Sequence, residues 1–417
     1  MRIDLLAPPF SGHLHPLLAI ARELATEFDV CVLSTPSAQA RIHAAGLRGR
    51  VVLGEADDRV LKDIANPPHA VKSNPIRMSR QFRSAIALMG RLKAELEMLY
   101  AHERPELVIA DFTLPAAGLV AQQLDIPWWT SMPSPCVIEA PDGPPAYMGG
   151  LKPADGLVSS FKHAVYRRTV RTFKQLIFKL YQRQIEGLGL TQLYRLDGTE
   201  RIYSPSRLLA LGLRELEFQR SWPAATRFVG PKLYTPPTYG GADPEFEPGK
   251  RHVLVTGGTH LRWIKDALAG ATRDAAQAMP EVVFHFTDGD EGQTRTLSQG
   301  NFVRLSYVDY EKHLAHYDLV VHHGGAGILY YCLLLGKPAV VYPIDYDQFD
   351  HAARLEHHGL AVWLRDLSHL QTDVADLLEG RRKLSGCQRF QALGQQVLGD
   401  VSSSSMTHLV HAYFNAQ

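Results

Sequence analysis

Residues 320–350 read V-V-H-H-G-G-A-G-I-L-Y-Y-C-L-L-L-G-K-P-A-V-V-Y-P-I-D-Y-D-Q-F-D. An apolar run that ends at His322 predicts a buried strand, and the stretch from about Ala326 to Leu335 predicts a helix that stops at Gly336. The glycines between them let the backbone approach a ligand closely, and the helix N-terminus offers unpaired N–H groups. The pattern predicts a strand–helix–strand unit of a parallel sheet, with a loop suited to an anion such as a diphosphate. A tight structural turn is the alternative that the loop alone leaves open.

The same alternation of strands and helices occurs in two series, which predicts an α/β protein with two doubly wound parallel sheets. Residues 233–250 are rich in proline and glycine and poor in aliphatic residues, as linkers are. We therefore expect one domain at 1–232 and a second at 251–417. The predicted strands are 2–8, 30–34, 106–111 and 126–131, then a stretch beginning at 252, 282–287, 301–305, 317–322 and 338–343; the first helix is expected at 17–27, after a loop at 10–16.

Composition narrows the class of protein. The 417 residues are 45% hydrophobic and 21% charged, and the formal net charge of +1 gives no overall electrostatic reason to expect a nucleic-acid partner. The four cysteines have no paired spacing, which indicates reduced thiols. The short N-terminal apolar run contains Asp4 and does not have the layout of a signal peptide, and no apolar stretch has the length of a membrane span. We expect a soluble, cytoplasmic protein.

Several polar residues follow predicted strands directly. His13, Asp111, the loop 256–259 and His323 all have this position, and Asp347 follows the next strand end. Ligands of doubly wound sheets bind beyond the carboxyl ends of the strands, where loops meet helix N-termini. We expect these residues to line a cleft between two facing domains.

The motifs together resemble a known family. H-G-G-A-G at 323–327 is followed about twenty residues later by D-Y-D-Q-F-D-H-A, and A-P-P-F-S-G-H-L-H-P-L-L, R-F-V-G-P and V-T-G-G-T occur at matching places earlier in the chain. This combination resembles the inverting nucleotide-sugar glycosyltransferases of the GT-B fold, family 1, in particular their macrolide, carotenoid and plant-metabolite branch. The resemblance implies two Rossmann-like domains facing across a cleft, the first for the acceptor and the second for the donor, and it allows the last helix to cross back to the first domain.

The resemblance also implies a donor site. His323 and the backbone amides after it would hold the diphosphate, Asp347 and Gln348 would contact the sugar, and the loop after the strand at 252 would approach the phosphates from the other side. Tyr307 and Val308 occupy the place where the family stacks and bonds the nucleotide base. The donor-binding residues expected on this basis are Thr256, Gly257, Gly258, Thr259, Tyr307, Val308, His323, Gly324, Gly325, Ala326, Gly327, Asp347 and Gln348.

Two positions depart from the family pattern. Ile328 stands where the family often has a serine or threonine on the phosphate, and Tyr331 stands where plant members have a glutamate for the ribose hydroxyls. The second departure leaves a thymidine-diphosphate sugar as open as a uridine-diphosphate sugar. Neither removes the helix N-terminus from the expected site.

His13 is the expected general base, because it matches the histidine of the family's H-x-x-P arrangement and His15 does not. An acceptor hydroxyl needs to lose its proton during attack, and an imidazole with a pKa near 6.5 suits that role. Asp111 would orient the ring and stabilise its protonated form. The alternatives are a helix-capping His13, or a metal site at His13 and His15, for which no third ligand is evident. The two D-x-D triplets, at 288–290 and 345–347, are common by chance; we expect neither a metal nor a cofactor.

The sequence says less about the identity of the acceptor and about contact with a membrane. Residues 159–183 contain seven Lys or Arg and no acid, with Tyr166, Val170, Phe173, Ile177 and Leu180 at helical spacing. Such a helix packs on its domain, lines an acceptor pocket, or lies against the inner face of a membrane. The segment P-W-W-T-S-M-P-S-P before it predicts an aromatic surface for a lipophilic acceptor.

The function predicted from these features is a metal-independent, inverting hexosyltransferase. It would move a sugar from a UDP- or TDP-sugar to a hydroxyl of a lipophilic small molecule. Two alternatives share the fold: a nucleotide-sugar 2-epimerase, and a degenerate subunit that binds nucleotide without turnover, which the departures at Ile328 and Tyr331 suggest.

Overall fold

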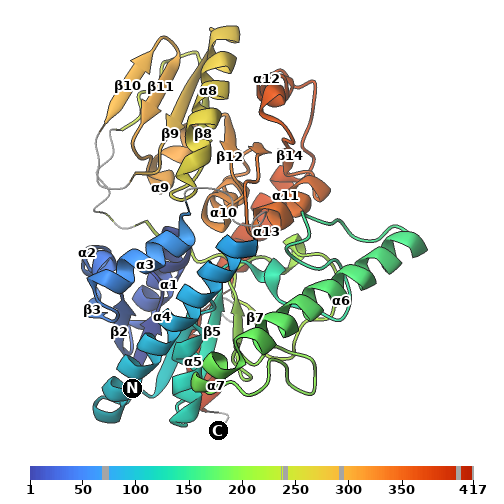
Figure 1. Ribbon diagram of the computed structural model, residues 1–417. Helices are drawn as coiled ribbons and strands as arrows, with labels where there is room; N and C mark the ends of the chain where they lie inside the picture. Colours follow the sequence, from blue (N-terminus) through green and yellow to red (C-terminus); the bar gives the residue numbers. More distant parts are fainter. Residues whose placement is uncertain (68–74, 236, 238–242, 291–294, 401–404, 416–417) are drawn as a thin grey trace.

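The computed structural model describes residues 1–67, 75–235, 237, 243–290, 295–400 and 405–415 (Figure 1). Within these residues the strands form two seven-stranded sheets, one in each half of the chain. Part of the expected linker, residues 236 and 238–242, lies outside the described residues. None of the helices that the described residues form combines the length and the apolarity needed to cross a bilayer.

The first sheet has the strand order 3-2-1-4-5-6-7, and all its neighbouring strands are parallel. Its strands are β3 (Arg48–Val51), β2 (Asp29–Ser34), β1 (Arg2–Leu6), β4 (Leu107–Asp111), β5 (Trp128–Met132), β6 (Leu208–Ala210) and β7 (Thr226–Phe228). Its helices are α1 (Ser11–Leu24), α2 (Gln39–Ala44), α3 (Glu55–Ala65), α4 (Pro75–His102), α5 (Pro115–Gln123), α6 (Leu157–Leu180) and α7 (Gln182–Gly187).

The second sheet repeats this architecture, with one antiparallel edge strand. β10 runs antiparallel to β11, and the other neighbours pair parallel. Its strands in spatial order are β10 (Thr296–Gln299), β11 (Phe302–Leu305), β9 (Val282–Thr287), β8 (Arg251–Thr256), β12 (Leu319–His322), β13 (Ala339–Val341) and β14 (Ala361–Trp363). Its helices are α8 (Arg262–Ala278), α9 (Tyr310–His313), α10 (Ala326–Leu334), α11 (Gln348–His357), α12 (Leu370–Leu378) and α13 (Cys387–Gly399); α15 (Met406–Phe414) follows them.

The strands are apolar without interruption because both faces of each sheet are buried. Successive side chains of a strand point to opposite faces of the sheet. Leu5 accordingly packs with Leu17 of α1 on one face, and Leu6 packs with Leu88 of α4 on the other. The predicted pair of doubly wound parallel-sheet domains is thereby confirmed.

The start of the first helix differs from the prediction. α1 begins at Ser11, so that His13 lies in its first turn and Pro16 lies inside the helix. Pro16 lacks the N–H that would bond the carbonyl of Gly12, so α1 forms with one backbone hydrogen bond missing in its second turn. The loop predicted at 10–16 is therefore wrong.

The chain crosses between the two domains twice, and both crossings contact Glu23 of α1. The Lys232 ammonium lies 2.9 Å from its carboxylate, and the backbone N–H of Met406 donates to the same carboxylate. A Cβ atom at Gly230 would lie 3.2 Å from the side chain of Val397, so the two crossings run side by side. Beyond the second crossing, α15 packs against α1, and Met406 is part of the core of the first domain.

A buried ion pair also joins the two domains. The side chains of Glu217 and of Arg354, which belongs to α11, are each 2% exposed. The Arg354 Nε donates to the Glu217 carboxylate over 2.8 Å. A second guanidinium, that of Arg220, lies 3.8 Å from the same carboxylate and donates to the Pro135 and Ile138 carbonyls. The segment around Glu217 packs in the core of the second domain, although it lies within the residues we assigned to the first.

Replacing Glu217 by alanine should destabilise the protein strongly. Two buried guanidiniums would then lack their shared carboxylate, and breaking a buried pair in this way costs about 3–5 kcal/mol. The loss is measurable as a shift of the urea unfolding curve. Lys152→Ala is the matched control, because it removes a surface ion pair with Glu356 (2.7 Å) across the same interface and leaves Glu356 its second partner, Arg365 (3.4 Å). This substitution should cost less than about 1 kcal/mol. Equal losses in the two variants would contradict a structural role for the buried pair.

Candidate active site

The expected catalytic pair is brought together where α1 follows β1. Because β1 and β4 are parallel neighbours, their carboxyl ends meet at one edge of the sheet, with His13 just beyond β1 and Asp111 at the last position of β4. The His13 Nδ1 atom lies 3.1 Å from both carboxylate oxygens of Asp111. The carboxylate is buried and also accepts the backbone N–H of Thr113 over 2.9 Å, which holds it in place.

The surroundings of His13 raise the pKa of its ring. Burial of the ring lowers the pKa of His13, but the charge and the hydrogen bond of Asp111 together raise it more, so that the pKa lies above the ordinary value of 6.5. Asp347, from the second domain, raises the same pKa further. Phe10 and Phe112 flank the ring at centroid distances of 6.3 and 5.6 Å.

Two glycine loops of the second domain enclose the ring of His323. A Cβ atom at Gly258 would lie 2.5 Å from the ring, and one at Gly325 would lie 2.4 Å from its Nε2. Any side chain at these two positions would therefore displace the imidazole. The glycines of V-T-G-G-T and H-G-G-A-G bring the ends of β8 and β12 together around one histidine.

The His323 Nδ1 atom is buried and has no hydrogen-bond partner among the described residues. Burial lowers the pKa of His323 to about 4, so the ring is neutral at neutral pH. An orphaned ring nitrogen at this place can meet an oxygen of a bound anion, whose charge would raise the pKa again. α10 begins three residues later, at Ala326, and its first N–H groups have no intrahelical partner.

The residues expected on the donor sugar have protein partners. The Ser134 hydroxyl, from the first domain, donates to the Asp347 carboxylate. The Gln348 Oε1 accepts the backbone N–H groups of Ile344 and Asp345 over 2.8 and 3.1 Å. Of the Gln348 side chain, only the amide NH₂ is therefore left to meet a sugar hydroxyl.

The two departures from the family pattern have different structural consequences. Ile328 is 3% exposed and packs in the core with Leu254 and Val320, so its side chain belongs to the hydrophobic core. The Tyr331 hydroxyl lies 3.3 Å from that of Thr235, which connects the expected ribose position to the residues that join the domains.

The remaining donor residues are placed as follows. The Thr256 hydroxyl contacts the Tyr310 hydroxyl at 3.1 Å and accepts the Gly258 N–H. Tyr307 and Val308 are 7% and 1% exposed, so the side chain of Val308 is not available for contact with a base. The V-T-G-G-T loop follows β8 and the expected base-binding segment follows β11, so both lie at the same edge of the sheet.

His260, which was not among the expected site residues, lies near both His13 and His323. Its ring meets Phe10 of the first domain edge-on at 5.0 Å. Burial lowers the pKa of His260 to about 4, and the charges of His13 and His323 lower it in turn, which places the ring near both. Its position directly after V-T-G-G-T was the signal that could have drawn attention to it.

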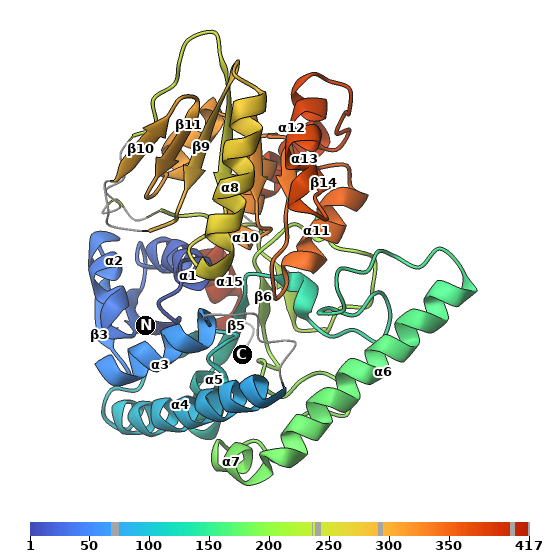
Figure 2. The same ribbon diagram turned by 45° about the horizontal axis from the view of Figure 1, so that its top comes forward.

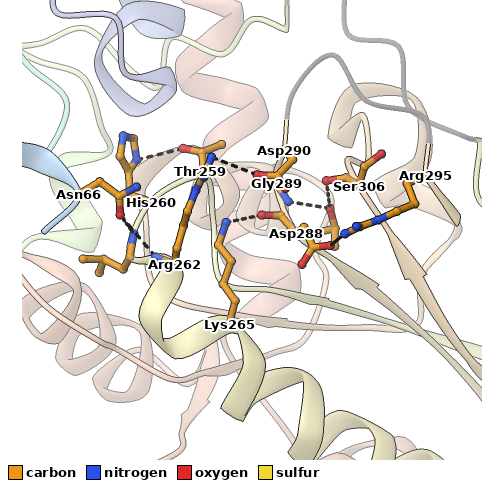
Figure 3. A network of polar contacts seen from close by, with 12 residues as sticks. Asn66, Thr259, His260, Arg262, Lys265, Asp288, Gly289, Asp290, Arg295 and Ser306 are labelled. Carbon is orange, nitrogen blue, oxygen red and sulfur yellow. Dashed lines mark hydrogen bonds and ion pairs between the residues drawn. The ribbon is translucent and has the colours of Figure 1, made fainter. Parts of the chain in front are cut away.

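Asn66 and Lys265 were also missed. The Asn66 side-chain oxygen accepts the backbone N–H of Leu261 over 2.9 Å, so a residue of the first domain caps the start of α8 in the second (Figure 3). Lys265 is 5% exposed, and its ammonium donates to the Asp288 carbonyl beneath the phosphate loop (Figure 3). Contacts between residues so distant in sequence leave no local pattern.

The D-x-D triplet at 288–290 has a structural role in this chain. The Asp288 carboxylate binds Arg304 over 2.7 Å. It also binds Arg295 over 3.2 Å (Figure 3). Among the described residues no three His, Cys, Asp or Glu side chains gather as a metal site would require.

The predicted aromatic surface at 127–135 is wrong. Trp128 and Trp129 are 4% and 0% exposed, because β5 is covered on both faces and successive side chains enter the two cores. A pocket of about 300 Å³ lies instead between the loop after β5 and α6. Its walls include Tyr147, whose backbone N–H donates to Asp350 of the second domain over 2.8 Å, so the pocket reaches the domain interface.

The sequence is similar to those of known glycosyltransferases. Residues 252–405 match the glycosyltransferase family 28 C-terminal domain. The chain is 25% identical to 4'-demethylrebeccamycin synthase of Lentzea aerocolonigenes over 89% of its length and 90% of that protein. It is 26% identical to zeaxanthin glucosyltransferase of Pseudescherichia vulneris over 90% and 89% of the two chains.

Solved structures share the fold along the whole chain. The glycosyltransferase of kitacinnamycin superposes with a TM-score of 0.73, at 20% identity, over 99% of this chain and 98% of that one. The Streptomyces glycosyltransferase SsfS6, complexed with thymidine diphosphate, has a TM-score of 0.63 and 17% identity over 100% and 99%. The predicted GT-B fold is confirmed. The chain is a glycosyltransferase with the GT-B fold, and it is similar to glycosyltransferases that act on natural products.

Replacing Asp111 by asparagine should lower the pKa of His13 below 6.5. The substitution removes the charge that raises this pKa and leaves the burial that lowers it. Titration of the imidazole protons by NMR measures the change. Because the folded pKa is raised, the stabilisation from the pair is complete below the unfolded pKa and is lost as the pH rises through the folded one. The difference in unfolding free energy between wild type and Asp111→Asn should therefore be larger at about pH 6 than at about pH 9. If the pKa of His13 does not fall in the variant, the pairing with Asp111 is contradicted.

Proposed function

We propose that this glycosyltransferase moves a sugar from a UDP- or TDP-sugar to a hydroxyl of a lipophilic small molecule, with inversion at the anomeric carbon. The observation that supports this most is the His13–Asp111 pair, with both oxygens of the carboxylate 3.1 Å from Nδ1. Nδ1 is thereby engaged, and Nε2 is the nitrogen that can receive a proton. The influence of Asp347 on the pKa of His13 indicates that the expected sugar residue lies near this base.

The chemistry is a single displacement. His13 Nε2 takes the proton of the acceptor hydroxyl as its oxygen forms a bond to the anomeric carbon. The bond from that carbon to the diphosphate breaks, and its electron pair remains on the departing phosphate oxygen. Asp111 holds the ring in one orientation and stabilises the imidazolium that forms.

The leaving diphosphate would bind between the two glycine loops. The N–H groups at the start of α10 are donors positioned before the reaction, and such groups stabilise charge that develops on a leaving group. His323 Nδ1 would become a further donor when the charge of the bound diphosphate raises the pKa of the ring. Asp347 and the Gln348 amide would hold the sugar, with sugar hydroxyls replacing Ser134 as the partner of Asp347.

The proposed donor and acceptor are inferred from similar proteins. One related protein is a zeaxanthin glucosyltransferase, and a solved structure with the same fold holds thymidine diphosphate. They support a hexose on a nucleoside diphosphate as donor and a hydrophobic natural product as acceptor. The pocket between α6 and the loop after β5 would take part of that acceptor.

Nucleotide binding tests the donor site. UDP or TDP titrated calorimetrically should bind saturably to the wild type, and His323→Ala should weaken binding about tenfold to a hundredfold, as expected for one hydrogen bond to a charged group. His369→Ala, an exposed histidine of the same domain, is the control and should bind like wild type. Absence of binding for both nucleotides would refute the donor site.

Turnover tests the catalytic assignment. With a flavonoid or macrolide alcohol as acceptor, His13→Ala should lower kcat by a factor of about 10²–10⁴ while the affinity for UDP or TDP is unchanged. His15→Ala, on the same helix, should retain most of the activity. NMR of the product should show the opposite anomeric configuration to the donor; a product with retained configuration, or an active His13→Ala enzyme, would overturn the mechanism.

A further inference from the structure

The solvent-facing side of α6 carries large apolar side chains. Their exposed fractions are 90% for Leu157, 86% for Val158, 72% for Phe161, 61% for Leu176 and 65% for Leu180. Isolated exposed apolar residues are ordinary, but contiguous exposed apolar surface marks an interaction site. Figures 1 and 2 show α6 running along the margin of the first domain, away from α2 and β3.

Helical geometry places these side chains in one stripe. Leu157, Phe161 and Val165 follow one another at intervals of four positions, and so do Leu176 and Leu180. Leu176 comes eleven positions after Val165, which is about three helical turns, so the two groups lie on the same side of the helix. The opposite side packs on the domain through another set of apolar residues: Tyr166, Val170 and Ile177 are half-buried. The helix is thus apolar on two sides. Of the five residues at helical spacing, Tyr166, Val170 and Ile177 are half-buried, whereas Phe173 and Leu180 are exposed.

The charges of α6 divide in the same way. Arg167, Arg171 and Lys174 face the domain, where they donate to the Gly143 carbonyl, the Gly198 carbonyl and the Glu139 and Glu200 carboxylates, respectively. Lys162, Arg168 and Lys179 are exposed. Residues 157–185 contain no aspartate or glutamate.

We propose that the outer side of α6, defined by Leu157, Val158, Phe161, Val165, Leu176 and Leu180 with Lys162, Arg168 and Lys179 beside them, binds the surface of an anionic lipid bilayer. An in-plane helix places apolar side chains at the boundary between head groups and acyl chains, and its basic residues contact anionic head groups. A second copy of this chain would bring like charges together, so charge complementarity favours the bilayer. Lipophilic acceptors dissolve in the same bilayer, and α6 also lines the pocket beside the domain interface.

Co-sedimentation with vesicles tests this surface. The protein should bind vesicles of phosphatidylcholine with phosphatidylglycerol, bind poorly to phosphatidylcholine alone, and dissociate as salt is raised. Loss of two surface cations corresponds to roughly thirtyfold weaker binding, and Lys162→Glu with Lys179→Glu should lose at least this much. The matched control is Arg59→Glu with Lys383→Glu, which makes the same change of charge at exposed positions elsewhere and should bind vesicles nearly as well as wild type.

A second variant separates insertion from charge attraction. Phe161→Ser with Leu176→Ser leaves all charges in place and should still weaken binding several-fold, while its melting temperature and nucleotide affinity stay unchanged because both side chains are exposed. Equal binding to neutral and anionic vesicles, or wild-type binding by the Lys162→Glu/Lys179→Glu protein, would overturn the proposal. So would a concentration-dependent dimer that the serine variant abolishes, since the stripe would then bind a second copy. Nucleotide binding in solution is measured separately, so either proposal can fail without the other.

Discussion

The buried Glu217–Arg354 pair constrains the orientation of the two sheets, and the candidate site depends on that orientation. Each sheet presents the carboxyl ends of its strands at one edge, and the ligand-binding groups of a GT-B enzyme lie on loops at both edges. His13 comes from one edge and His323 from the other. A charged pair with 2% exposure tolerates little displacement, because an unpaired buried charge is costly. The same helix that carries Arg354 begins at Gln348, directly after Asp347, so this constraint also places the expected sugar-binding residues.

Local patterns predicted most of the fold. Apolar runs such as those at 107–111 and 319–322 have no interpretation other than buried strands once helices alternate with them, and the glycine stops marked the helix ends. The errors arose where a residue has two common uses. Pro16 lies inside α1 although proline prefers the first turn, and Trp128 and Trp129 fill cores although tryptophan is common at binding surfaces.

The site was predictable where its residues follow strands and was missed where it depends on contact between domains. His13, Asp111 and the two glycine loops follow strand ends, and parallel pairing brings such ends together. Three residues make contacts across the interface. Asn66 caps α8, Ser134 bonds Asp347, and the ring of His260 packs against Phe10. Partners separated by about two hundred residues leave no periodic signal, so only the folded arrangement reveals them.

The two adjacent crossings of the chain have a mechanical consequence. Both are fastened to Glu23, and they run side by side at Gly230 and Val397. Two connections that contact the same helix limit the relative movements of the domains more than a single connection would. Because α15 packs on α1 beyond the second crossing, the second domain is held to the first at both of its ends.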